Sequence, residues 1–150
     1  MPDLHHTIDL LVDREFIQPN QNSPETEFTF RHVLMSDAIY GTLLRKESSA
    51  LHGQVAEAIE RMYIDRQEEH VEVLANHYRM SLFSDRALHY LLLAGQKAIR
   101  NQANQQARQY FESALELLPN ARPSEYQRFL AQSGMGDVLL YIGEYPEARE

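Results

Sequence analysis

The chain has 150 residues, of which 43% are hydrophobic and 24% are charged. This supplies enough apolar material for one domain or two small ones and is too much for a disordered segment. No apolar run approaches the roughly 20 residues needed to cross a membrane, and the absence of Cys excludes disulfides and thiolate metal sites. The net charge is −8, and residues 1–50 alone carry eight acids against four bases. Nucleic-acid binding requires clustered Lys and Arg side chains, so we expect partners that are proteins rather than DNA or membranes. The absence of Cys favours a reducing cytoplasm.

The first 32 residues predict a helix, a loop and a short strand. Residues 4–17 place Leu4, Ile8, Leu11 and Val12 on one helical face. Residues 18–25, QPNQNSPE, are rich in Pro, Asn and Ser, which break regular structure. Residues 26–32 alternate apolar and polar side chains, as a strand does. A β-hairpin near residues 18–32 is therefore possible, and the order of elements resembles the end of a winged-helix module over residues 1–45.

From His32 the apolar spacing changes to that of helices. One stripe contains Met35, Ile39 and Leu43, with Tyr40 and Leu44 beside it. A second stripe contains four residues: Leu51, Val55, Ile59 and Met62. We expect two helices packed on a core, broken at residues 45–49, RKESS, where Ser48 or Ser49 caps the second helix.

The rest of the chain predicts an all-α arrangement of antiparallel helices joined by short connections. The expected helices cover 68–82, 84–101, 104–119 and about 124–142, with another beginning in residues 144–150. Ser84 is a candidate N-cap for the second of these helices, and Pro119 ends the third. Residues 46–86 are interpreted as a connecting helical region.

Residues 88–119 match a helix-pair repeat of about 34 residues. With Pro119 at the end of the unit, Leu88 takes its first position, and small or aromatic residues follow at the eighth, twentieth, twenty-fourth and twenty-seventh positions: Gly95, Ala107, Phe111 and Ala114. This spacing resembles the tetratricopeptide repeat. We expect Gly95 and Ala107 to allow the two helices to touch, while Phe111 fills the space beyond.

A second, partial unit follows in the same frame. Gly136 lies 41 residues after Gly95, and Ala148 lies 41 residues after Ala107. Gly143 stands before Tyr145 in the expected inter-helix turn. The sequence ends within the second helix of this unit. We therefore interpret residues 87–150 as repeats whose last member is truncated, and the chain as a fragment of a longer protein.

Several motifs resemble a known class of signalling proteins. These motifs are Phe30 and His32 in the strand, Tyr40 with Leu43 and Leu44 in the next helix, then LHGQVAEAIE at 51–60 and LANHY at 74–78. They resemble the segment after the nucleotide-binding module in STAND-class signal-transduction ATPases, in which tetratricopeptide repeats follow an AAA-like ATPase, often with a class III cyclase or LuxR-type output domain. Asp37, Ser48 and Ser49 depart from the usual pattern.

The resemblance implies a regulatory scaffold that contacts protein partners or the ATPase and output domains of its own protein. It also makes Phe30, His32 and Tyr40 the junction between strand and helix. At His32 we expect a packed ring with one hydrogen bond, and a regulatory contact to nucleotide is the alternative. The sequence contains no G-x-x-x-x-G-K-[ST] motif. DNA binding by the winged-helix fragment of a transcriptional regulator is the alternative function.

The remaining polar and aromatic residues do not indicate an enzyme. His70 and His77 are seven residues apart and could share a helical face, but zinc needs three or four convergent ligands, so exposed or hydrogen-bonded histidines are the preferred interpretation. Tyr78, Tyr90 and Tyr110 with Phe111 either line a peptide groove or pack between helices, and core packing is preferred for Tyr78 and Phe111. We expect no catalytic residue, cofactor or metal in this chain.

Overall fold

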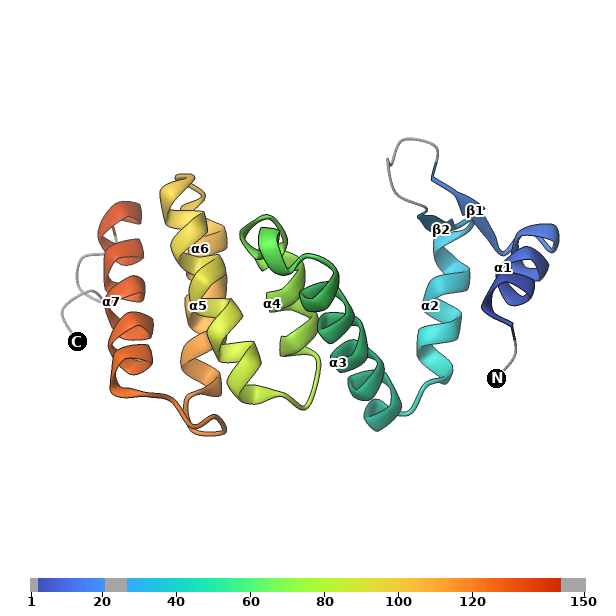
Figure 1. Ribbon diagram of the computed structural model, residues 1–150. Coiled ribbons are helices and arrows are strands. Elements are labelled where there is room, and N and C mark those ends of the chain that lie inside the picture. Colours follow the sequence, from blue (N-terminus) through green and yellow to red (C-terminus); the bar gives the residue numbers. More distant parts are fainter. Residues whose placement is uncertain (1–2, 21–26, 144–150) are drawn as a thin grey trace. The chain divides into compact units, whose positions relative to one another are not determined.

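The computed structural model describes residues 3–20 and 27–143, and most of them are α-helical, with a single two-stranded hairpin in this described part (Figure 1). The predicted all-α fold with one short hairpin before residue 33 is confirmed. The chain divides into an N-terminal unit, Met1–Leu44, and a C-terminal unit, Arg45–Glu150. The expected connecting region and the expected repeats therefore belong to one compact unit.

The N-terminal unit contains α1 (Leu4–Asp13), β1 (Ile17–Pro19), β2 (Phe28–Phe30) and α2 (Val33–Thr42). Asp3 caps α1, because its side chain accepts a hydrogen bond from the His5 backbone N–H at 3.2 Å. The prediction of a helix to residue 17 is too long. Glu15 has φ of 60°, which turns the chain out of the helix and into β1.

The two strands pair antiparallel with Ile17 opposite Phe30 and Pro19 opposite Phe28. An ion pair between Arg31 and Glu15, at 3.1 Å, joins the strand ends. The predicted alternation of residues 26–32 is thus a strand, although its paired part is only three residues long.

No described residue of the N-terminal unit is buried. Of the predicted stripe, Met35 and Leu43 are half-buried and Ile39 is 45% exposed, so the described residues of this unit do not enclose the core that we expected beneath α2. A unit of this size has too little interior to enclose its apolar side chains by itself.

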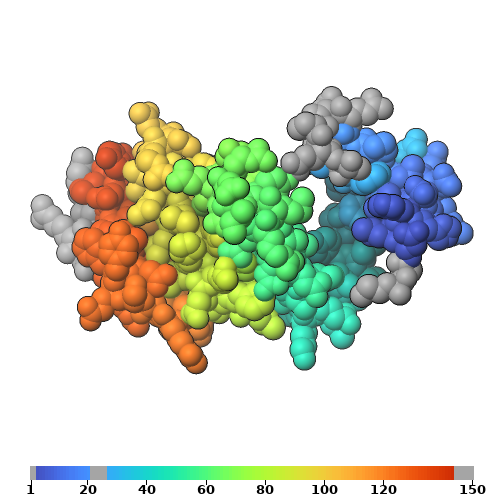
Figure 2. Space-filling model, viewed as in Figure 1, coloured from blue at the N-terminus to red at the C-terminus, as the bar shows by residue number. Residues whose placement is uncertain are grey.

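The C-terminal unit is a row of helices. They are α3 (Arg45–Met62), the 3₁₀ helix η1 (Ile64–His70), α4 (Val71–Arg79), α5 (Ser84–Arg100), α6 (Asn104–Leu117) and α7 (Glu125–Ile142). Each helix packs against the next, and α5 also contacts α7 (Figure 1). In the space-filling view, side chains fill the spaces between the ribbons of α3 to α6 (Figure 2).

The break between α2 and α3 lies at Leu43 and Leu44, not at residues 45–49 as predicted. Leu43 has an extended backbone with ψ of 135°, and Thr42 Oγ1 donates to the carbonyl of Ile39 at 2.7 Å, which ends α2. Residues 45–49 form the first turn of α3 instead, because Arg, Lys and Glu are good helix formers. Ser48 and Ser49 consequently lie inside the helix.

The buried face of α3 also differs from the predicted stripe. Of the predicted stripe, Ile59 is half-buried and packs against the core, whereas Leu51, Val55 and Met62 are 47%, 41% and 69% exposed. The buried residues of α3 are His52, Gly53 and Ala56. A Cβ on Gly53 would lie 2.7 Å from the Phe83 ring, so small side chains set this close contact. The apolar spacing predicted burial of the larger side chains of the stripe rather than of these smaller ones.

The helix predicted over 68–82 corresponds to α4, which begins later than predicted and follows a 3₁₀ helix. Residues 64–70 form η1, and Arg66 leaves helical geometry with φ of −135° and ψ of 31°, so α4 begins only at Val71. Ser84 is the first residue of α5 rather than its N-cap, which is Phe83. The Phe83 N–H donates to Ser81 Oγ at 3.1 Å, so Ser81 stabilises this turn.

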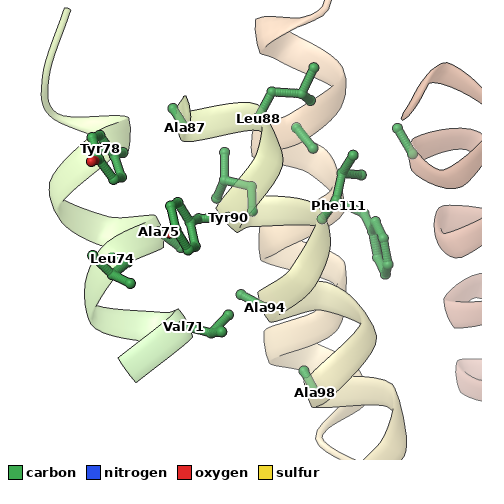
Figure 3. Close-up of a cluster of buried hydrophobic side chains, with 14 of the residues drawn as sticks. Val71, Leu74, Ala75, Tyr78, Ala87, Leu88, Tyr90, Ala94, Ala98 and Phe111 are labelled. Carbon is green, nitrogen blue, oxygen red and sulfur yellow. The ribbon is translucent and has the colours of Figure 1, made fainter. Parts of the chain in front are cut away.

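The core runs through α4, α5, α6 and α7. Figure 3 shows Val71 of α4 pointing toward α5. Ala75 and Tyr78 of α4 belong to the same buried cluster. The buried residues of α5 include both alanines and leucines, with Ala94 at 0% exposure. Ala107 and Ala114 of α6 are likewise 0% exposed.

Phe111 is the central side chain of the α5, α6 and α7 contact and is 1% exposed. A Cβ on Gly95 would lie 2.7 Å from its ring, and a Cβ on Gly134 would lie 2.3 Å from it. Gly95 therefore makes room for the Phe111 ring, whereas we expected Gly95 and Ala107 to let the two helices touch and Phe111 to fill the space beyond them. Gly134 of α7 does the same from the other side, a contact that the repeat frame did not predict.

Both ends of α7 are capped, and its end at Gly143 agrees with the turn expected there. The side chain of Ser124 accepts from the Gln127 N–H, and Gln127 accepts from the Ser124 N–H, which forms a capping box for α7. Gly143 ends α7 in the left-handed region at φ of 84°, where glycine is favoured. Pro119 follows the end of α6 by two residues. Gly136 is half-buried, and its expected partner helix, including Ala148, lies outside the described residues.

Candidate functional site

The candidate functional site is an open groove of about 660 Å³ in the C-terminal unit, between η1 and α5. Its lining combines carboxylates, amides, bases and three larger apolar or aromatic side chains. The residues are Gln67, Glu68, Glu69, Val71, Tyr90, Leu93, Gln96, Lys97, Arg100 and Asn101. This mixture suits an extended peptide, whose backbone needs hydrogen-bond partners and whose side chains need apolar contact.

Lys97 fixes one wall of the groove. Its Nζ donates to the Glu68 backbone carbonyl at 2.9 Å and to Glu72 Oε2 at 2.8 Å, so it connects α5 with η1 and α4. On η1 itself, the ring of His70 stacks on Tyr63 with centroids 3.8 Å apart. The guanidinium of Arg66 lies 5.6 Å from the Tyr63 ring. These contacts hold the irregular 3₁₀ segment beside the groove.

Tyr90 lines the groove and belongs to a polar cluster of four residues. The Tyr78 and Tyr90 hydroxyls donate to Glu60 Oε2 and Oε1, each at 2.5 Å, and Arg86 donates to Oε1 at 2.6 Å. The two tyrosine rings are stacked, with centroids 5.4 Å apart and planes 7° from parallel. Glu60 lies on α3, Tyr78 on α4 and the other two on α5, so the cluster ties three helices together.

The protonation states of this cluster suit a structural role. Burial raises the pKa of Glu60, but the hydroxyls of Tyr78 and Tyr90 and the charge of Arg86 outweigh it, and the pKa is lowered. Burial and the Glu60 carboxylate raise the pKa of both tyrosines. Near neutral pH Glu60 is thus charged and the tyrosines are protonated. None of these groups is poised to exchange a proton with a substrate.

A second pair of polar side chains lies between α3 and α4. The Nδ1 atoms of His52 and His77 are 3.0 Å apart, and the ring centroids are 5.1 Å apart. His52 is 8% exposed, and His77 is half-buried. Burial, and then the charge of His52, lower the pKa of His77.

The structure separates the two histidines considered as metal ligands from sequence. His70 stacks on Tyr63, while His77 faces His52. Among the described residues, no three His, Asp or Glu side chains are grouped as a metal site requires.

The four aromatic residues considered for a peptide groove have different positions. Tyr78 and Phe111 are each 1% exposed and belong to the core, which was the preferred interpretation. Tyr90 lies in the core and also borders the groove between η1 and α5. Tyr110 lines a different groove of about 500 Å³, formed by residues of α4, α5 and α6.

The junction residues lie in the N-terminal unit. His32 is exposed, and its side chain forms no capping hydrogen bond at the start of α2. Phe30 is 43% exposed and lines an apolar pocket of about 520 Å³ with residues of α1, β1 and α2. Tyr40 is 52% exposed.

Sequence reasoning missed both the Glu60 cluster and the His52–His77 pair. Each joins residues that are 18 to 30 positions apart, and side-chain spacing within one helix carries no information about such partners. One signal was present: the two histidines belong to the motifs LH at 51–52 and HY at 77–78. The structure brings these motifs together.

Comparison with known proteins adds little. No family model matches the sequence, and no solved structure matches it. The chain is 26% identical, over 145 residues, to an uncharacterized protein of Rhizobium meliloti (strain 1021). The match covers 91% of this chain and 14% of that protein, so the chain spans about one seventh of the relative's length. Within the described residues, no helix is both long and apolar enough to span a membrane.

Proposed function

We propose that this chain is a non-catalytic scaffold segment of a larger signalling protein, and that it binds an extended peptide segment in the groove between η1 and α5. The observation that carries the proposal is the groove itself. Lys97 bonds across it, Tyr90 lines it, and it carries amide side chains at Gln67, Gln96 and Asn101. Amides pair with both the N–H and the carbonyl groups of a peptide backbone.

The helix packing supports a repeat array as the setting of this groove. Gly95, Phe111 and Gly134 interlock α5, α6 and α7, and α5 contacts α7 as first helices of successive repeats do. In this proposal residues 87–150 are tetratricopeptide-like repeats, and residues 1–45 are the end of a winged-helix-like module. The parent is a cytoplasmic STAND-class ATPase, to which the motifs at residues 30–32, 51–60 and 74–78 are similar.

The proposed mechanism is a population shift. The array packs on the ATPase or output domains of its own protein in a closed form, and a partner segment in the groove favours an open form. A ligand shifts such an equilibrium only by its differential affinity for the two forms. The chain itself supplies contacts and no chemistry, in keeping with a Glu60 cluster whose protonation states are fixed near neutral pH.

Selection of displayed random peptides on the purified chain tests the proposal. We expect enriched peptides that bind the wild type, lose affinity with Gln96→Arg or Arg100→Glu, and keep it with the control Gln105→Arg, an exposed position of α6 outside the groove. Peptides that bind all four proteins equally would contradict it.

Two further measurements separate the proposal from its competitors. Calorimetric titration with Mg-ATP should give no heat of binding, because the sequence has no phosphate loop. A gel-shift assay with duplex DNA at low salt should show no complex, since the net charge is −8. A salt-dependent DNA complex would favour the transcription-factor alternative instead.

A further inference from the structure

The two walls of the groove between η1 and α5 carry opposite charges. Glu68 lies on η1, and Lys97 and Arg100 lie on α5. Lys97 already has partners, because its Nζ donates to Glu72 Oε2 at 2.8 Å and to the Glu68 backbone carbonyl at 2.9 Å. Within residues 3–20 and 27–143, neither the guanidinium of Arg100 nor the carboxylate of Glu68 forms an ion pair or a side-chain hydrogen bond. Both side chains are exposed, so each can pair with a charge on a bound segment.

The lining residues of α5 follow one face of the helix. Leu93, Gln96 and Arg100 recur at spacings of three and four residues, and Lys97 lies beside Gln96. A helix rises about 1.5 Å per residue, so Leu93 and Arg100 are separated by about 10 Å along the axis. Leu93 is half-buried and packs against the hydrophobic core, which leaves part of its side chain for apolar contact. The α5 wall therefore offers an apolar contact, an amide and a base in that order.

An extended peptide of the polyproline II type matches this spacing. It rises about 3.1 Å per residue with three residues per turn, so side chains three positions apart lie on the same side and about 9 Å from each other. When one such side chain contacts Leu93, the other lies beside Arg100, and the residues between them face η1. Glu68 lies at this level of the groove, because its backbone carbonyl accepts from Lys97, one turn before Arg100. A basic side chain between the two positions can therefore reach Glu68.

We propose that the groove is selective for a peptide segment with an apolar side chain at one position, an acidic side chain three residues away and a basic side chain between them. Leu93 contacts the apolar side chain, Arg100 pairs with the acidic one, and Glu68 pairs with the basic one. This inference rests on the proposed function and adds the chemistry of the partner segment to it. A segment with the two charges exchanged places like charges together, which disfavours its binding.

Charge substitutions in the peptide test the proposal on the wild-type chain. The probes are synthetic copies of peptides enriched by selection on this chain, in which we expect the apolar and acidic residues to be three positions apart. Replacing the acidic residue by its amide, or the basic residue by Met, should weaken binding about two- to fivefold, the range that exposed ion pairs contribute. The peptide with its two charges exchanged should bind more weakly still. Equal affinities for all four peptides, measured by calorimetric titration, would overturn the proposal.

Exchange of charge between chain and peptide identifies the partner of the acidic residue. With Arg100→Glu, the peptide carrying Lys at the acidic position should bind more tightly than the original peptide, which reverses the order seen with the wild type. Arg79→Glu is the matched control: it changes the net charge by the same amount, but Arg79 is an exposed residue of α4 that lines the separate groove of about 500 Å³. The wild-type order should persist in this control. An unchanged order with Arg100→Glu, or a reversed order with Arg79→Glu, would contradict the role of Arg100.

Failure of this inference and failure of the proposed function give different results. Enriched peptides that lose affinity with Gln96→Arg but show no preference for charge would leave the peptide groove in place and refute the charge pairs. If no peptides are enriched, or if Gln96→Arg does not affect them, the groove binds no peptide and both proposals fail. The peptide substitutions keep the test decisive if Arg100→Glu does not fold, because they leave the wild-type chain unchanged.

Discussion

The two units of this chain contain similar apolar side chains, but these are exposed in the N-terminal unit and buried in the C-terminal unit. Leu34 in α2 of the N-terminal unit is 80% exposed, whereas Leu74 in α4 of the C-terminal unit is 0% exposed. Both lie on helices of nine or ten residues. The difference is the number of neighbouring helices, because α4 packs against α3, η1 and α5. Burial in this chain therefore depends on neighbouring helices more than on the hydrophobicity of any one segment.

The largest expected effect is at the centre of the C-terminal core. Phe111→Ala removes a 1% exposed ring that fills the space between Gly95 and Gly134, and it leaves a cavity. We expect a loss of about 3–5 kcal/mol in the free energy of unfolding, measured by urea denaturation. If the loss stays below about 1 kcal/mol, this region has no tighter core than the N-terminal unit, and the contrast between the units disappears.

The next effect concerns the polar cluster that ties α3 to α4 and α5. Glu60→Gln removes the charge that three donors share, and hydrogen bonds to charged groups contribute about 1.5–3 kcal/mol. Because folding lowers the pKa of Glu60, its contribution is present above the ordinary glutamate value and is lost as pH falls through the lower folded value. The variant and the wild type should therefore differ at pH 7, and the difference should shrink as the pH falls below the ordinary glutamate value. A difference that stays constant throughout acidification would show that the carboxylate charge is not the cause.

These two contacts also show what sequence reasoning can and cannot find. The helices, the hairpin and the alignment of Gly95, Ala107 and Phe111 follow from spacing within single segments, which the sequence states directly. Glu60 and His52 acquire their partners only when α3 lies against α4, and no periodicity encodes that pairing. The buried face of α3 was predicted wrongly for the same reason, because its contacts are made with other helices. Gly53 and Ala56 are buried by the Phe83 side chain and neighbouring helices rather than by their own hydrophobicity.

Glycine-to-alanine changes compare the two units directly. A Cβ on Gly134 would lie 2.3 Å from the Phe111 ring, which is held on all sides, whereas a Cβ on Gly41 of α2 would have nothing within 4 Å. Gly134→Ala should lower the free energy of unfolding by about 1–3 kcal/mol. Gly41→Ala should cause no loss, since alanine favours a helix by about 0.5–1 kcal/mol over glycine. Thermal unfolding followed by circular dichroism measures both, and the reverse ranking would contradict the packing described for α6 and α7.

The smallest effect is expected in the N-terminal unit. Ile39 lines the apolar pocket of α2 but is 45% exposed, so nearly half of its surface already lies in water and its truncation removes little burial. We expect Ile39→Ala to change the free energy of unfolding by less than about 1 kcal/mol. Leu74→Ala is the matched comparison, because Leu74 is 0% exposed and the same truncation in a core typically costs about 2–5 kcal/mol. Both variants are measured by urea denaturation at pH 7.5. If Ile39→Ala proves as damaging as Leu74→Ala, Ile39 is as buried in solution as Leu74, and the contrast in burial between the two units is contradicted.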